Sequence, residues 1–132
     1  AYLKSSSVSA NKSFKKGLEH LLAEDIVQTF YMKEYGAVMP LLGAVGPLQF
    51  EVLQYRLRDE YGVESNLETK PWEVMRWIGG DADEIRSILP SNSAVAEDDR
   101  GRAVALFPNT WSMDYFLKNN PDVKLLDSPE SV

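Results

Sequence analysis

The densest positive charge in the chain lies in five residues near its start. Lys12, Lys15 and Lys16 are spaced i, i+3 and i+4, so a helix would place all three on one side. Ammonium groups on one helix face can contact the phosphates of a nucleic acid. They can equally form an ordinary solvated helix face, and the residue spacing leaves both interpretations open.

A glycine-rich segment, Gly43-Ala44-Val45-Gly46, precedes Pro47. Backbone amides at a helix N-terminus can hold phosphate, and RNA-binding KH modules use a GxxG loop. Here the middle residues are apolar and a predicted strand comes first, so we expect a structural turn built by Gly43, Gly46 and Pro47. If Gly46 has a positive φ, Gly46→Val should destabilise the fold by roughly 1–3 kcal/mol.

One histidine and several carboxylates could do acid–base chemistry. His20 has Glu19 beside it and Glu24 four residues on, but no motif supplies a nucleophile, so we interpret His20 as a solvated imidazole. The absence of cysteine excludes thiolate metal sites and a cysteine nucleophile. No G-x-x-x-x-G-K-[ST] phosphate loop occurs. We therefore assign no catalytic, cofactor-binding or metal-binding residue.

Several aromatic residues could stack on nucleic-acid bases, but aromatics at strand and helix positions are typical of a core. We expect the following to be core residues: Phe30, Tyr31, Tyr35, Trp72, Trp77 and Trp111. The carboxylates clustered in residues 81–99 are expected to form a solvated surface. We assign no function to the acidic segment 91–102.

The composition fits a small globular protein. The chain has 132 residues, 44% hydrophobic and 26% charged, enough for one domain or two small lobes. Its net charge of −6 argues against broad nucleic-acid binding, so any phosphate contact would be local. No run approaches the ~20 apolar residues of a membrane span. We expect a soluble cytoplasmic protein and, since no initiator Met is present, a fragment of a longer polypeptide.

Hydrophobic spacing predicts the elements of the first half. A helix follows Ser9, with apolar residues at Phe14, Leu18, Leu21 and Leu22. A second helix runs from Pro47 to Tyr61 and ends at a left-handed Gly62 cap. Its buried stripe is expected at Phe50, Leu53, Leu57 and Tyr61, widened by Val52. Strands are predicted at 26–32, 37–42 and 63–69.

The second half shows a similar mixture of elements. Strands are predicted at 73–78, 94–96, 103–107 and 123–126. One helix is capped by Asp81 and runs to Leu89, and another is capped by Asn109 or Thr110. The order αββαβ followed by βα(β)βαβ predicts an α+β fold whose sheets are covered by helices. We expect a single domain, 1–132, with sub-lobes at 10–70 and 71–132.

The segment 43–52, GAVGPLQFEV, continuing through Leu57 to Tyr61-Gly62-Val63-Glu64, resembles the carboxy-terminal domain (domain III) of bacterial peptide chain release factor three. Further similarity lies in 16–18, 27–30, 76–78 and 121–123, so the resemblance covers the chain from about residue 12. Pro47 departs from the polar residue expected there, and 91–102 does not align. The first half also resembles the third domain of elongation factor G, which implies a ferredoxin-like fold.

The resemblance implies a translational GTPase that uses GTP to dislodge class-one release factors from the ribosome. It implies that GTP and magnesium bind an amino-terminal G domain that has no counterpart here, so this part alone is not an enzyme. The implied partners are the ribosome, through its RNA and proteins, other domains of the same chain and, indirectly, class-one release factors, with no membrane. Lys12, Lys15 and Lys16 are the candidate ribosome contacts. The alternative is a stand-alone α+β RNA-binding module.

Overall fold

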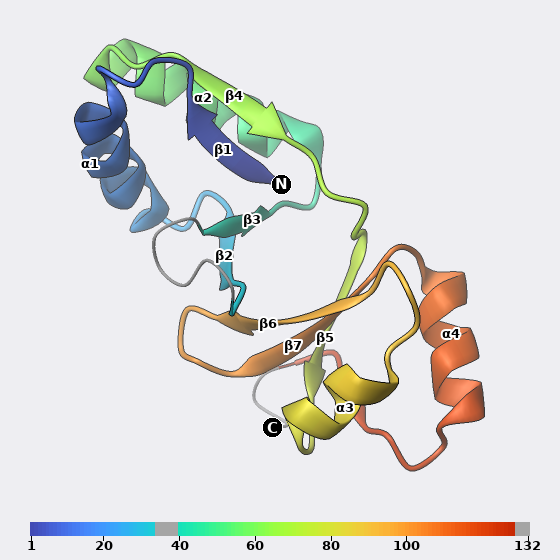
Figure 1. The fold of residues 1–132 in the computed structure, drawn as a ribbon. Helices are drawn as coiled ribbons and strands as arrows, with labels where there is room; N and C mark the ends of the chain where they lie inside the picture. The colour runs from blue at the N-terminus through green and yellow to red at the C-terminus, as the bar shows by residue number, and fades with distance from the viewer. Residues whose placement is uncertain (34–39, 129–132) are drawn as a thin grey trace. The chain divides into compact units, whose positions relative to one another are not determined.

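The helices and strands follow the predicted order, with one additional strand at the start. The computed structural model describes residues 1–33 and 40–128 (Figure 1). The predicted strand at 37–42 falls partly, and Tyr35 wholly, outside these residues. The α+β class with helix-covered sheets is confirmed. The elements are β1 (Tyr2–Ser5), α1 (Asn11–Leu22), β2 (Gln28–Tyr31), β3 (Leu41–Gly43), α2 (Pro47–Tyr61), β4 (Ser65–Glu68), β5 (Val74–Ile78), α3 (Ala82–Ile88), β6 (Ala94–Asp98), β7 (Ala103–Phe107), α4 (Thr110–Asn119) and β8 (Leu125–Leu126).

The chain divides into two compact units, with the main boundary after Lys70. Unit 1 comprises residues 1–30 and 40–70 of the described chain, and unit 2 comprises 31–33 and 71–128. Each unit has its own cluster of buried hydrophobic residues.

Unit 1 has a ferredoxin-like strand arrangement. β1 pairs with β4 and β2 pairs with β3, both antiparallel. Ala1 and Leu42 exchange two backbone hydrogen bonds, of 2.8 and 2.9 Å, which is the pattern of an antiparallel pair and joins the start of β1 to β3. The resulting order β4-β1-β3-β2, with a helix after β1 and another after β3, is the ferredoxin-like arrangement expected from the resemblance.

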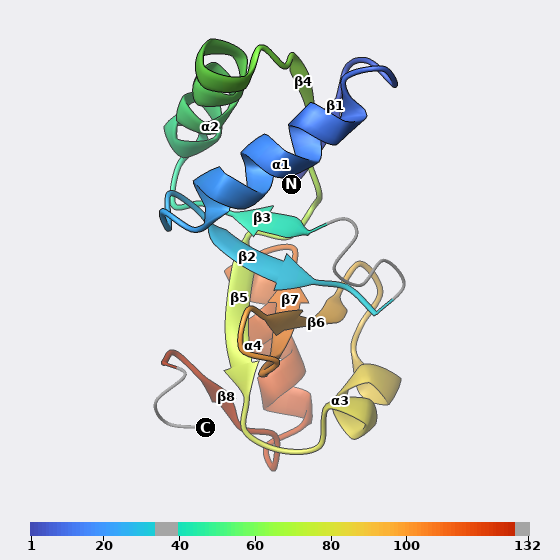
Figure 2. The ribbon, with the colours of Figure 1, turned by 90° about the vertical axis from the view of Figure 1, so that its left-hand side faces the viewer.

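The core of unit 1 lies between the strands and the two helices. Figure 2 shows α1 and α2 next to each other. Three residues of the predicted apolar stripe of α1, Phe14, Leu18 and Leu21, are buried, and Leu22 is partly buried. Leu53 and Leu57 of α2 are buried as well. Gly62 ends α2 in the left-handed conformation, with φ of 65°, as predicted. The cluster contains Leu3, Phe14, Leu18, Leu21, Val27, Leu42, Leu53, Leu57 and Val63.

Two expectations for unit 1 are wrong. The start of the chain forms β1, which the sequence does not predict because a four-residue strand ending in serine carries little periodic signal. Val52 does not widen the buried stripe of α2 but is exposed. At 100° per residue, Val52 lies about 100° from Leu53 and about 140° from Leu57, so it lies on the opposite side of the helix.

Unit 2 contains an antiparallel sheet in the order β6-β7-β5-β8. Ala105 and Phe107, two residues apart on β7, bury their side chains against both helices, with Ile85 from α3 and Phe116 from α4. Residues two apart on a strand point to the same face of the sheet. Both helices pack on that face, so α3 and α4 cover the same side of this sheet. Asp81 caps α3 and Asn109, rather than Thr110, caps α4.

Candidate nucleic-acid interface

The three lysines lie on the side of α1 that faces away from the core. Lys12, Lys15 and Lys16 are exposed, whereas the apolar stripe on the opposite side of the helix is buried. No ion pair involves any of the three within residues 1–33 and 40–128. Glu19, also exposed, follows one turn later on the same side. We call Lys12, Lys15 and Lys16 the lysine face; its ammonium groups are accessible to an anionic partner.

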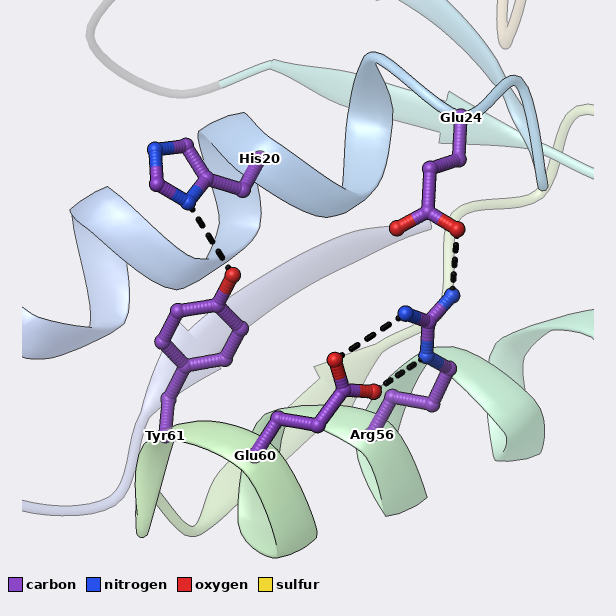
Figure 3. Close-up of polar contacts among 5 residues, drawn as sticks. All are labelled: His20, Glu24, Arg56, Glu60 and Tyr61. Atoms are coloured by element: carbon purple, nitrogen blue, oxygen red, sulfur yellow. Dashed lines mark hydrogen bonds and ion pairs between the residues drawn. The ribbon is translucent and has the colours of Figure 1, made fainter.

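A close contact between α1 and α2 fixes the orientation of the lysine face. Gly17 is buried against Tyr61 and Leu57 of α2. At the end of the same contact, His20 Nδ1 and Tyr61 Oη share a hydrogen bond of 3.1 Å (Figure 3). His20 is exposed as predicted, but its partner is a tyrosine from another helix and not a carboxylate.

A charged cluster ties the end of α1 to α2 beside this contact. Arg56 Nη1 donates to Glu24 Oε1 at 2.7 Å, and Arg56 Nη2 donates to Glu60 Oε1 at 3.0 Å (Figure 3). The hydrogen bonds to Glu60 and Glu24 raise the pKa of Arg56, and the guanidinium lowers the pKa of Glu60. Because these groups are at the surface, solvent screens the pairs, and we treat them as orienting contacts. Glu24 is thus paired with Arg56 and not with His20, so the structure does not contain a His20–Glu24 pair for acid–base chemistry.

The turn before α2 is structural, and its geometry differs from the prediction. Gly43 belongs to β3, and a Cβ there would lie 2.9 Å from the Phe30 ring. Gly46 has φ of −145° and ψ of 162°, an extended conformation open to any residue, so the expected positive φ is wrong. Pro47 occupies the first helical turn as predicted.

Gln49 organises this turn, a role that the sequence did not predict. Its side-chain Oε1 accepts hydrogen bonds from the amides of Val45, at 2.7 Å, and Gly46, at 3.3 Å. Its Nε2 donates to the carbonyl of Ile26 at 2.9 Å. A Gln at the third helical position is half of the capping-box signal; the other half, a Ser or Thr at the N-cap, is absent because the N-cap is Gly46. Since the Val45 and Gly46 amides are already bonded, they are not free to hold a phosphate.

The aromatic residues of unit 2 are less buried than predicted. Trp111 is 71% exposed, which contradicts its assignment to the core, and its ring stacks on Tyr115 with centroids 5.4 Å apart. Trp72 and Trp77 are partly buried, and their indole N–H groups donate to Asn92 O and Asp98 Oδ2. These two bonds fix the rings within unit 2.

Asp98 is the exception to the predicted solvated acidic surface. It is only 5% exposed and accepts hydrogen bonds from the amides of Arg100 and Arg102, from Arg102 Nε at 2.7 Å and from Trp77. Burial opposes ionisation, but these donors outweigh it and hold the pKa of Asp98 below its ordinary value. Asp98 therefore organises the β6–β7 turn, in which Arg102 supplies a guanidinium to the carboxylate and Gly101 has a positive φ of 78°.

The comparison with known proteins decides the family. The sequence matches the family described as "Class II release factor RF3, C-terminal domain" over residues 1–117. The chain belongs to this release factor family. The resemblance to release factor three drawn from residues 43–64 is thus confirmed, and membership places the chain in protein synthesis, at translation termination.

Relatives named peptide chain release factor 3 agree with this membership. The protein of Symbiobacterium thermophilum is 46% identical over 111 residues, which cover 84% of this chain and 21% of that protein. Those of Acaryochloris marina and Nostoc punctiforme are 41% and 39% identical over 126 residues, covering 95% of this chain and 23% of each relative. The chain spans less than a quarter of the length of these release factor relatives.

No group of three or more His, Asp or Glu side chains within residues 1–33 and 40–128 is arranged to hold a metal ion. In the same ranges, no helix is both long and apolar enough to cross a bilayer.

Proposed function

We propose that this chain is the carboxy-terminal part of a GTP-using release factor that removes class-one release factors from the ribosome. The observation that carries the proposal is the family match over residues 1–117, together with relatives named peptide chain release factor 3. We place its site of action in the cytoplasm, where ribosomes translate.

Within that protein, this part supplies binding contacts and not the chemical step. The chain contains no G-x-x-x-x-G-K-[ST] sequence, so its residues do not fit the phosphates of GTP. We therefore derive no nucleotide step from it and assign GTP and magnesium to another domain of the longer protein. The contacts that remain are with the ribosome and with neighbouring domains.

The lysine face is the proposed ribosome contact. Its three ammonium groups project from the exposed side of a helix whose other side is fixed against α2. Ribosomal RNA presents phosphates, and lysines that neutralise phosphates contribute affinity that does not depend on sequence. The net charge of −6 supports a local and oriented contact, because the remaining surface repels RNA.

The full-length protein tests the proposal. With GTP, it should accelerate dissociation of a class-one release factor from ribosomes that have already released their peptide. Replacing Lys12, Lys15 and Lys16 together with Glu should slow this reaction at limiting protein concentration. The matched control replaces three exposed cations of unit 2, Arg100, Lys118 and Lys124, with Glu and should have a smaller effect. Absence of any GTP-dependent acceleration by the unmodified protein would contradict the proposal.

A further inference from the structure

Helix α2 is apolar on both of its sides. Leu53 and Leu57 are fully buried in the core of unit 1. On the opposite side, three exposed apolar residues of the helix follow one another at spacings of four and three. We call them the outward face of α2: Leu48 is 67% exposed, Val52 42% and Tyr55 56%. A surface helix normally has a single apolar stripe, so a second stripe made of exposed apolar residues indicates a surface that a partner covers.

The charges beside the outward face indicate a protein partner and not RNA. Glu51 and Asp59 are exposed on the same side of the helix as Leu48 and Tyr55. One cation, Arg58, also lies beside this face, with its guanidinium 5.7 Å from the centre of the Tyr55 ring. The carboxylates would repel phosphates, and the apolar side chains between them offer phosphates no hydrogen-bond donors. The outward face thus differs in chemistry from the lysine face of α1.

The size of the outward face favours a partner on the same polypeptide. A specific interface between separate proteins takes about 20–30 residues from each side, whereas this face has three apolar residues. A covalently linked partner is held at high effective concentration, so a smaller interface suffices. In the relatives, more than three quarters of the polypeptide lies outside the matched segment.

We propose that another domain of the same polypeptide packs on the outward face of α2 and buries Leu48, Val52 and Tyr55. This rests on the proposed function only in that the chain is part of a longer release factor. The partner surface is apolar, with a basic rim that complements Glu51 and Asp59. Helix α2 then lies between the core of unit 1 and the second domain, and both apolar sides of the helix are buried.

Hydroxyl-radical footprinting of the full-length protein, free in solution, tests this directly. Tyr55 and Tyr115 are a matched pair, since both are tyrosines and both are 56% exposed in this chain. Each rate is compared with that of the same residue in the unfolded protein. Tyr55 in the folded protein should react roughly tenfold more slowly than in the unfolded protein, as in a fully buried interface core. Tyr55 is 56% exposed in this chain alone, which by itself slows its reaction only modestly. A decrease in the Tyr55 rate no larger than this would overturn the proposal.

A second measurement separates this proposal from ribosome binding. If Tyr55 becomes protected only when the full-length protein is bound to ribosomes, its partner is ribosomal; the interdomain proposal is then overturned while the proposed function stands. If Tyr55 is already protected without ribosomes, the interdomain proposal is supported. Tyr55→Glu should also lower the melting temperature of the full-length protein more than Tyr115→Glu does. Equal effects of the two variants would contradict the proposal.

Discussion

Gly17 on α1 lies directly against the ring of Tyr61 on α2. A Cβ at position 17 would be 2.8 Å from Tyr61 Cγ and 3.1 Å from Leu57 Cδ2, distances too short for an undisturbed contact. The glycine therefore lets the two helices approach closely. This approach sets the orientation of α1, whose opposite side carries the lysine face.

Gly17→Ala should destabilise the protein although alanine is the better helix former. Helix propensity alone would stabilise the variant by about 1 kcal/mol. The new methyl group meets the base of the Tyr61 ring and not a flexible end, and overpacking of this kind costs roughly 1–3 kcal/mol. We expect a net loss of up to about 2 kcal/mol in the free energy of unfolding, measured by denaturant titration. If Gly17→Ala is more stable, α1 and α2 can move apart to accommodate the methyl group, and the prediction is wrong.

Two glycines at the ends of α2 should respond differently to alanine. Gly62 has φ of 65°, so Gly62→Ala should cost about 1 kcal/mol because the side chain is strained there. Gly46 is extended, and a Cβ there meets no atom within 4 Å, so Gly46→Ala should change stability by less than about 0.5 kcal/mol. Thermal unfolding of both variants measures this difference in stability. A larger loss for Gly46→Ala would contradict the observed turn.

The sequence predicts the helices well because their signals are local. Pro47 and Gly62 mark the two ends of α2, and the spacing of Phe14, Leu18 and Leu21 identifies the buried side of α1. The strand at 103–107 also has the predicted bounds, since five consecutive apolar residues are typical of a buried strand. These features depend only on neighbours along the chain.

The features that the sequence did not predict depend on distant residues. β1 exists through its pairing with β4, more than sixty positions away at Tyr2 and Glu68. Trp111 is exposed because Met113 and Phe116 occupy the buried side of α4. Asp98 is buried because a turn of the chain surrounds its carboxylate with donors. The arrangement of the lysines on one helix side was predictable from spacing, whereas the Gly17–Tyr61 contact that orients them was not.

Asp98 should make stability depend on pH. Since its pKa is lower in the folded than in the unfolded protein, it stabilises the fold above the ordinary pKa of an aspartate, and this contribution is lost as pH falls through the folded-state pKa. Asp98→Asn should cost roughly 1–3 kcal/mol at pH 7 and progressively less in acid. Denaturant titrations from pH 7 to pH 3 measure this. Asp99→Asn, at an exposed neighbour, is the control; a pH-independent loss in Asp98→Asn would contradict the account.

The 132-residue chain should neither bind GTP tightly nor hydrolyse it, with or without ribosomes. It lacks the glycine-rich loop, lysine and Ser/Thr that hold the phosphates and magnesium in such enzymes. Equilibrium binding of a fluorescent GTP analogue and a phosphate-release assay test this. Ribosome-stimulated turnover above that of a mock purification would refute the prediction.

The salt dependence of ribosome binding tests most directly whether the lysine face contacts RNA. The affinity of the full-length protein for ribosomes is measured at several salt concentrations, for the unmodified protein and for the variant with Lys12, Lys15 and Lys16 replaced by Glu. If each lysine neutralises one phosphate, the variant should bind more weakly and the slope of log affinity against log salt should flatten by about 2–3, while GTP affinity stays unchanged. The Arg100, Lys118 and Lys124 control should keep the original slope. Superimposable lines for the unmodified protein and the lysine variant would show that these lysines do not contact the ribosome.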